Sequence, residues 1–172
     1  MSTVNNKNQK TYLHKYDIII IREIINGVFK MLKFHVKALT MDTENNFSVL
    51  LADEEEKKVL PIVIGPLEAQ NIAVPLQNIE IQRPLTPDLL KTAIERLGGL
   101  VENIIITNLQ NDTYYAEIHI KQEDKLIKLD SRPSDAIALA LRYNMPIYIN
   151  MGLAEFTYDI ADISFEDGEN NV

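Results

Sequence analysis

The stretch Asp130-Ser131-Arg132-Pro133-Ser134-Asp135 runs directly into six apolar residues, 136–141. Pro133 suits the first turn of a helix and Ser131 can cap it, so the stretch predicts a helix start. Six consecutive apolar residues leave no polar stripe, which predicts a helix packed on most sides. The chain is therefore expected to fold around this helix, whose charged start is a cap, a functional site, or both.

Strand patterns flank this helix in the sequence. Alternating apolar residues at 34–38 and 47–51 predict a hairpin, and the almost continuously apolar residues 59–64 predict a third strand buried on both faces. Because hairpins precede the first helix, we expect an α+β fold, a single domain with a mixed, mostly antiparallel β-sheet and three main helices; an α/β sandwich is the alternative. The other expected elements are strands at 101–109, 114–120, 126–129 and 146–149, a helix at 66–78, and a helix at 87–97 with Thr86 as its N-cap.

The composition excludes several kinds of site. The chain has no cysteine, and His14, His35 and His119 lack ligand-pair spacing, so a zinc site is not expected. His119 falls on the polar face of its strand and is expected to be solvated rather than a ligand. Acidic side chains outnumber basic ones, 25 to 17, so nothing resembles the basic footprint on which nucleic-acid binding normally rests.

Charge and composition divide the chain into three parts. Residues 1–30 are an N-terminal extension, partly disordered or an upstream-extended start; alternatively Asp17 to Phe29 form an amphipathic element that docks on the domain or on a partner chain. Residues 31–154 are the patterned domain, and residues 155–172 are an acidic C-terminal tail. The apolar residues 18–25 are interrupted by charges and too short to span a membrane, so we expect a cytoplasmic protein.

Three segments of the chain stand out together: Leu60-Pro61-Ile62-Val63-Ile64-Gly65 with Glu68-Ala69, Arg83-Pro84-Leu85-Thr86-Pro87-Asp88-Leu89, and residues 130–140, the most specific of the three. They resemble the bifunctional nuclease family, in the family's order and spacing. The resemblance implies an α+β fold, a tendency to form homodimers, and nuclease activity on DNA and RNA. The family often has His where this chain has Pro87, so a general base supplied by that His would be missing here.

A nuclease must bind a phosphodiester, activate water and stabilise negative charge, which acidic enzymes usually manage with Mg²⁺ or Mn²⁺. Asp130 and Asp135 are candidate catalytic residues and metal ligands, and Glu68, at another helix start, is a third catalytic candidate. A guanidinium matches a phosphate bidentately. The candidate substrate-binding residues are therefore Arg83 and Arg132, together with Ser134.

A structural interpretation of these residues competes with the functional one. Asp135 complements the helix dipole, and Arg132 can form an ion pair with Asp130 or Asp135. A functional site requires that the helix starts at Glu68 and Asp88 converge on residues 130–135. The leading hypothesis is a divalent-metal-assisted nuclease with nucleic acid as its substrate; the alternative is a non-catalytic dimeric regulatory or scaffold module, favoured by the acidic excess.

Overall fold

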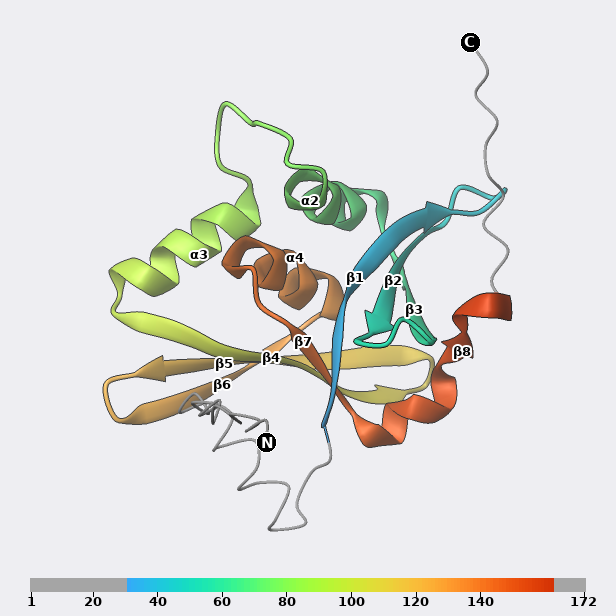
Figure 1. The fold of residues 1–172 in the computed structure, drawn as a ribbon. Coiled ribbons are helices and arrows are strands. Elements are labelled where there is room, and N and C mark those ends of the chain that lie inside the picture. The colour runs from blue at the N-terminus through green and yellow to red at the C-terminus, as the bar shows by residue number, and fades with distance from the viewer. Residues whose placement is uncertain (1–30, 163–172) are drawn as a thin grey trace, which may run out of the picture. The chain divides into compact units, whose positions relative to one another are not determined.

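The computed structural model describes residues 31–162, so the predicted N-terminal extension and residues 163–172 of the acidic tail lie outside the described residues (Figure 1). In chain order its elements are β1 (Met31–Met41), β2 (Phe47–Asp53), β3 (Lys58–Ile64), α2 (Pro66–Leu76), α3 (Thr86–Arg96), β4 (Gly99–Gln110), β5 (Thr113–Gln122), β6 (Lys125–Ser131), α4 (Pro133–Tyr143), β7 (Ile147–Asn150), the 3₁₀ helix η1 (Met151–Phe156), β8 (Tyr158–Asp159) and the 3₁₀ helix η2 (Ile160–Asp162).

The strands form one eight-stranded sheet in the order β6-β5-β4-β7-β1-β2-β3-β8. Every neighbouring pair is antiparallel except β4 with β7, which is parallel. The sheet is therefore mixed and mostly antiparallel, and it carries three main helices. The α+β prediction is confirmed.

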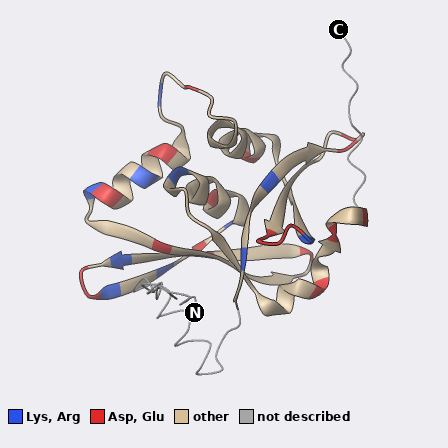
Figure 2. Ribbon diagram, viewed as in Figure 1, with Lys and Arg blue, Asp and Glu red and all other residues tan. Residues whose placement is uncertain are grey.

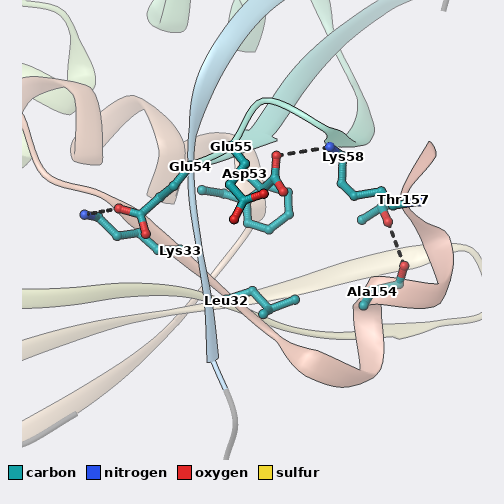
Figure 3. Close-up of a pocket in the computed structure, with 9 residues that line it drawn as sticks. Leu32, Lys33, Asp53, Glu54, Glu55, Lys58, Ala154 and Thr157 are labelled. Carbon is teal, nitrogen blue, oxygen red and sulfur yellow. Dashed lines mark hydrogen bonds and ion pairs between the residues drawn. The ribbon is translucent and has the colours of Figure 1, made fainter. Parts of the chain in front are cut away.

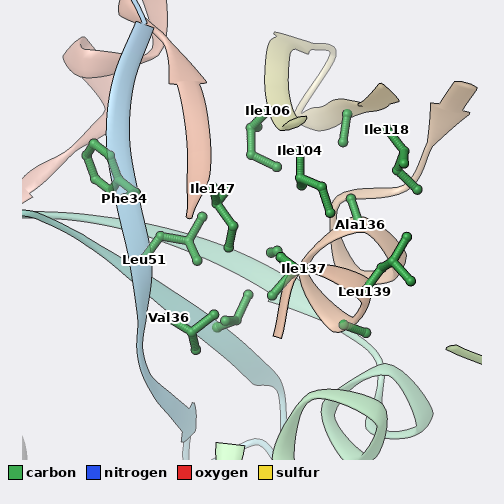
Figure 4. Packing of buried hydrophobic residues seen from close by; sticks show 14 of the residues in the cluster. Phe34, Val36, Leu51, Ile104, Ile106, Ile118, Ala136, Ile137, Leu139 and Ile147 are labelled. Carbon is green, nitrogen blue, oxygen red and sulfur yellow. The ribbon is translucent and has the colours of Figure 1, made fainter. Parts of the chain in front are cut away.

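Helices α2, α3 and α4 lie on the same side of the sheet (Figure 1), and α4 contacts both other helices as well as β4 and β5. Its residues from Ala136 to Ala140 are all buried. They pack in one cluster with Ile104, Ile106 and Ile118 (Figure 4). Burying an aliphatic side chain of this size contributes about 1.5–3 kcal/mol. The prediction of a central helix packed on most sides is confirmed.

Two helices end where left-handed backbone is required. Gly98 follows α3 with a φ of 78°, a conformation that glycine adopts without a steric penalty. Asn144 ends α4 with a φ of 49°, and its N–H donates to the carbonyl of Leu141. The end of α3 agrees with the helix predicted at 87–97.

Both predicted helix caps were wrong by one residue. Thr86 lies inside α3, and the N-cap is Leu85, whose N–H donates to Oδ2 of Asp88 at 2.8 Å. The N-cap of α4 is Arg132, whose carbonyl oxygen accepts the hydroxyl of Ser131. The start of α3 is thus held by a carboxylate rather than by the hydroxyl that the sequence suggested.

Two predictions of burial were also wrong. Val63, near the end of β3, is 73% exposed, because alternation along the strand places it on the opposite face from the buried Leu60 and Ile62. His119 is only 8% exposed, and its Nε2 atom lies 2.7 Å from Oε2 of Glu117. Strand periodicity assigned His119 to a face but could not show how closely that face is packed.

The sheet extends beyond residue 154, because β8 pairs with the start of β3. Ile160 packs against a small second cluster formed by Leu50, Ala52 and Val59. None of the helices in the described part of the chain has the length and apolar character needed to cross a lipid bilayer.

Candidate functional site

Arg132 is the centre of a charged cluster at the junction of β6 and α4. Its Nε atom donates to Oδ2 of Asp135 at 2.7 Å, and Nη2 donates to Oδ1 at 3.0 Å. Its Nη1 atom donates to Oε1 of Glu68 at 2.7 Å. Both carboxylates raise the pKa of Arg132, Asp135 more than Glu68, so the guanidinium stays protonated. The cluster joins the start of α4 to the start of α2.

Glu68 lies in the first turn of α2, directly after Gly65-Pro66. Its own backbone N–H and then Arg132 lower the pKa of its carboxyl group, so Glu68 is ionised at neutral pH. A Cβ atom at Gly65 would collide with the Glu68 carboxylate. Glycine at this position therefore lets the carboxylate fold back over the helix start, where the N–H groups and helix dipole favour negative charge.

A pocket of about 450 Å³ opens beside this cluster. The starts of α2 and α4 meet there, and unpaired N–H groups at helix starts favour anions. Three of the sequence-predicted site residues, Glu68, Arg132 and Ser134, share the pocket, although Ser134 is only 6% exposed. The lining residues are Pro61, Ile62, Val63, Ile64, Gly65, Glu68, Asp112, Thr113, Tyr114, Arg132, Pro133 and Ser134.

The turn between β4 and β5 is the part of the pocket that sequence reasoning missed. It contributes Asp112, Thr113 and Tyr114, and burial together with nearby Tyr158 raises the pKa of Tyr114, which keeps its hydroxyl neutral. The sequence marks these residues only as a polar turn. Their place beside the start of α4 follows from the pairing of β5 with β6, which leads into Arg132.

Asp130 lies apart from the other candidates. It is exposed on β6, where it pairs with Glu117, whereas its neighbour Ser131 pairs with the buried Ala116. Because side chains alternate along a strand, Asp130 faces away from the helices and from the pocket. The structure brings Asp135 and Glu68 to Arg132 but does not bring Asp130 to them.

Asp88 and Arg83 also lie apart from the pocket, so the expected convergence of helix starts on residues 130–135 is met by Glu68 but not by Asp88. Asp88 is held by Arg142 of α4, whose Nε atom donates to Oδ1 at 2.7 Å. The side chain of Arg142 is only 5% exposed, and its Nη1 atom also donates to the carbonyls of Asn71 and Ala138. This pair joins all three helices. Arg83 is exposed in the loop between α2 and α3 and does not line the pocket.

The carboxylates beside Arg132 meet the minimal requirement of a magnesium or manganese ion. Mg²⁺ in proteins is commonly bound by one or two carboxylates, with waters and substrate phosphate as the other ligands. Glu68 and Asp135, held by the same guanidinium, supply two. Among residues 31–162, no group of three or more His, Cys, Asp or Glu side chains is placed to hold a metal. Glu68 and Asp135, both engaged by Arg132, are therefore the residues of this cluster that could hold such an ion.

A second pocket, of about 310 Å³, lies between β1, the turn after β2 and η1 (Figure 3). Its polar groups are engaged in local structure. Asp53 accepts the N–H groups of Lys57 and Lys58, and Lys33 pairs with Glu54 at 2.6 Å. We therefore favour the pocket beside Arg132 as the functional site.

Basic residues are not concentrated at either pocket. In the view of Figure 2, the Lys and Arg positions are spread over α3, β1, β5 and β6 and alternate with acidic ones. Attraction of a polyanion would therefore rest on local groups, namely Arg132 and the two helix starts, rather than on a broad positive field.

The residues around this pocket fall within a segment that matches a known domain family. Residues 49–157 match a model of the bifunctional nuclease domain, and this range includes Glu68, Arg132 and Asp135. An uncharacterized protein of Mycobacterium tuberculosis strain H37Rv is 38% identical over 130 residues, which are 75% of this chain and 77% of that protein.

Plant relatives carry functional names. Bifunctional nuclease 1 of Oryza sativa subsp. indica is 33% identical over 109 residues, and bifunctional nuclease 2 of Arabidopsis thaliana is 30% identical over 109. In both cases the match covers 62% of this chain but only 33% of the plant protein. The chain thus corresponds to about a third of each plant relative.

Proposed function

Because this chain belongs to the bifunctional nuclease family, we propose that it hydrolyses phosphodiester bonds of DNA and RNA in the pocket beside Arg132. The observation that supports this most directly is the position of the Arg132 guanidinium, 64% exposed, where two helix starts meet at one pocket. A guanidinium and helix-start N–H groups together form a phosphate-binding site.

Arg132 would bind the phosphate through the N–H groups that its carboxylate partners leave free. Three of the five N–H donors of the guanidinium donate to Glu68 or Asp135, so Nη1 and Nη2 each keep one for a phosphate. The two carboxylates would repel a phosphate bound there unless a cation neutralised them. This requirement supports the proposal that the enzyme is assisted by Mg²⁺ or Mn²⁺.

Glu68 suits a ligand better than a general base. An efficient general base has a pKa near the working pH, whereas the pKa of Glu68 is held below its ordinary value. A bound divalent ion would supply Lewis-acid chemistry and would lower the pKa of a coordinated water. Glu68 and Asp135 would hold the ion, Arg132 would orient the phosphate, and Ser134 would contribute a polar group to the pocket wall.

The proposal retains the homodimer that the family resemblance implies and the cytoplasmic location expected from the sequence. It does not use Arg83 or Asp130 in the site, since neither lines the pocket or forms an ion pair with Arg132; Asp135 does not line the pocket but is kept because it pairs with Arg132. The alternative, a non-catalytic dimeric regulatory or scaffold module, makes the same predictions for folding and assembly. Only a measurement of catalysis separates the two.

The test is cleavage of single-stranded DNA and of RNA by the purified full chain, with Mg²⁺, Mn²⁺ or EDTA. Arg132→Met should lower kcat/KM by at least about 100-fold, the usual effect of removing one donor that stabilises a transition state. Arg96→Met, which removes an exposed arginine at the end of α3, is the matched control and should retain activity. Equal activity of Arg132→Met and wild type would refute the assignment, and an inactive but folded wild type would favour the alternative.

A further inference from the structure

Strand β6 forms one edge of the sheet, and the two edges differ greatly. The opposite edge, β8, has two residues, whereas β6 has seven, of which all but Ser131 are exposed. Within residues 31–162 no strand pairs with the outer side of β6. An exposed edge of this length is a template for pairing with another strand.

The β6 edge is unusually apolar for an exposed strand. Ile127 and Leu129 are 41% and 42% exposed, and they lie on the helix side of the sheet because they pair with Ile120 and Ile118 of the core. Leu126, on the other face, is 51% exposed. Apolar side chains are thus exposed on both faces of the edge, as is typical of an interaction surface.

Two charges between these apolar residues have no ion-pair partner in the described part of the chain. Lys128 and Asp130 lie on the face away from the helices, paired in register with His119 and Glu117. Asp130 and Glu117 are like charges directly across two strands, an unfavourable arrangement. A positive charge placed on the outer side of Asp130 would offset it.

We propose that β6 is the dimer surface, on which β6 of a second copy pairs antiparallel about a two-fold axis at Leu129. In this register Lys128 of each copy lies directly opposite Asp130 of the other, and the two Leu129 side chains meet on the helix side. The two sheets then form one continuous sheet of sixteen strands, by doubling the eight of one copy.

Charge selects this register among its neighbours. Pairing centred on Lys128 would place the two Lys128 side chains against each other and Leu126 against Asp130. Pairing centred on Asp130 would place two aspartates together and Lys128 against Arg132. Opposite charges across a strand pair are favourable and like charges are not. Of these three registers, the one centred on Leu129 is the one that places opposite charges face to face.

This surface gives Asp130 a role that does not require it to reach the pocket. The proposal rests on the homodimer named in the proposed function and says which surface forms it, but it does not depend on nuclease activity. Because β6 leads directly into Arg132, the interface would also fix the strand that positions the guanidinium. The experiment below measures the oligomeric state and not nuclease activity. A negative result would therefore count against this dimer surface and not against the proposed activity.

The experiment is charge reversal on the full chain, read by analytical ultracentrifugation at low ionic strength. Lys128→Glu and Asp130→Lys each place like charges opposite one another twice per dimer, and each should weaken dimerisation at least about tenfold. The double variant Lys128→Glu/Asp130→Lys should restore it. Glu80→Lys, in the exposed loop before α3, is the matched control and should dimerise like wild type.

A mixture of the two single variants gives the sharpest result. In a heterodimer of Lys128→Glu with Asp130→Lys, both cross-strand pairs are again of opposite sign, so the mixture should dimerise although neither variant does alone. Circular dichroism would show that each variant is folded. A wild type that is monomeric at all concentrations, or single variants that dimerise as tightly as wild type, would overturn the proposal.

Discussion

The Nη1 atom of Arg132 lies 2.7 Å from Oε1 of Glu68, although the residues are 64 positions apart in the sequence. The contact joins the starts of two helices that follow different strands of the sheet. Since Arg132 also holds Asp135, one guanidinium links both candidate carboxylates. Any phosphate that enters the pocket meets this cluster, so substitutions within it are expected to differ in effect from substitution of Arg142, at the other end of α4.

Arg132→Lys keeps the positive charge but loses the planar fork that can hold a phosphate with two hydrogen bonds. We expect kcat/KM for nucleic-acid cleavage to fall about 10- to 100-fold, less than for Arg132→Met. The free energy of unfolding should change by no more than about 1 kcal/mol, because exposed ion pairs contribute little. Arg96→Lys is the control, and undiminished activity of Arg132→Lys would show that only charge matters there.

The lowered pKa of Glu68 predicts how the stability of the fold depends on pH. Its folded-state pKa is lowered, so its ionised form stabilises the fold above the unfolded pKa of about 4.3, and this contribution is lost as pH falls through the lower folded pKa. Wild type should therefore be more stable than Glu68→Gln at pH 7, and the difference should shrink below about pH 4. Urea unfolding at a series of pH values measures this. A difference that stays constant across the series would contradict it, and Glu80→Gln is the matched control.

The helix that organises the fold was predictable from local sequence alone. Residues 136–141 are apolar without interruption, and only a helix surrounded by other elements can bury a run such as 136–140. The order of strands and helices likewise indicated a mixed sheet. These predictions succeeded because each rests on contacts between residues that are close in the sequence or on a strong periodic pattern.

The site was only partly predictable, because it depends on long-range contacts. The charge pattern pointed to Arg132 and Glu68 but could not show that they touch. Asp130 and Asp135 are five residues apart, yet the alternation of β6 and the start of α4 send their side chains to different sides of the sheet. Asp112 joins the pocket only through strand pairing. Proximity in sequence was therefore a poor guide at the strand-to-helix junction.

Arg142 is expected to matter for stability rather than for activity. Arg142→Met leaves Asp88 and two backbone carbonyls without their donor, and leaving a largely buried acceptor without its donor typically costs about 1–3 kcal/mol. Burial opposes the ionisation of Asp88, but Arg142 and the N–H of Leu85 outweigh it and lower the pKa. Thermal unfolding should show the loss, while the specific activity of the folded fraction stays within about twofold of wild type. A stable but inactive Arg142→Met would instead place this pair in the catalytic site.

Metal binding would distinguish the pair Glu68 and Asp135 from the pair Asp130 and Asp135 that the sequence suggested. Calorimetric titration of the wild type with Mn²⁺ should show binding, which Glu68→Gln and Asp135→Asn should each weaken at least about tenfold, since each removes one of two protein ligands. Asp130→Asn should bind Mn²⁺ like wild type, because Asp130 faces the other side of the sheet. Binding that requires Asp130 but not Glu68 would reverse the assignment. Arg132→Met should bind the ion at least as tightly as wild type, because the carboxylates are then released from the guanidinium with which a cation must compete.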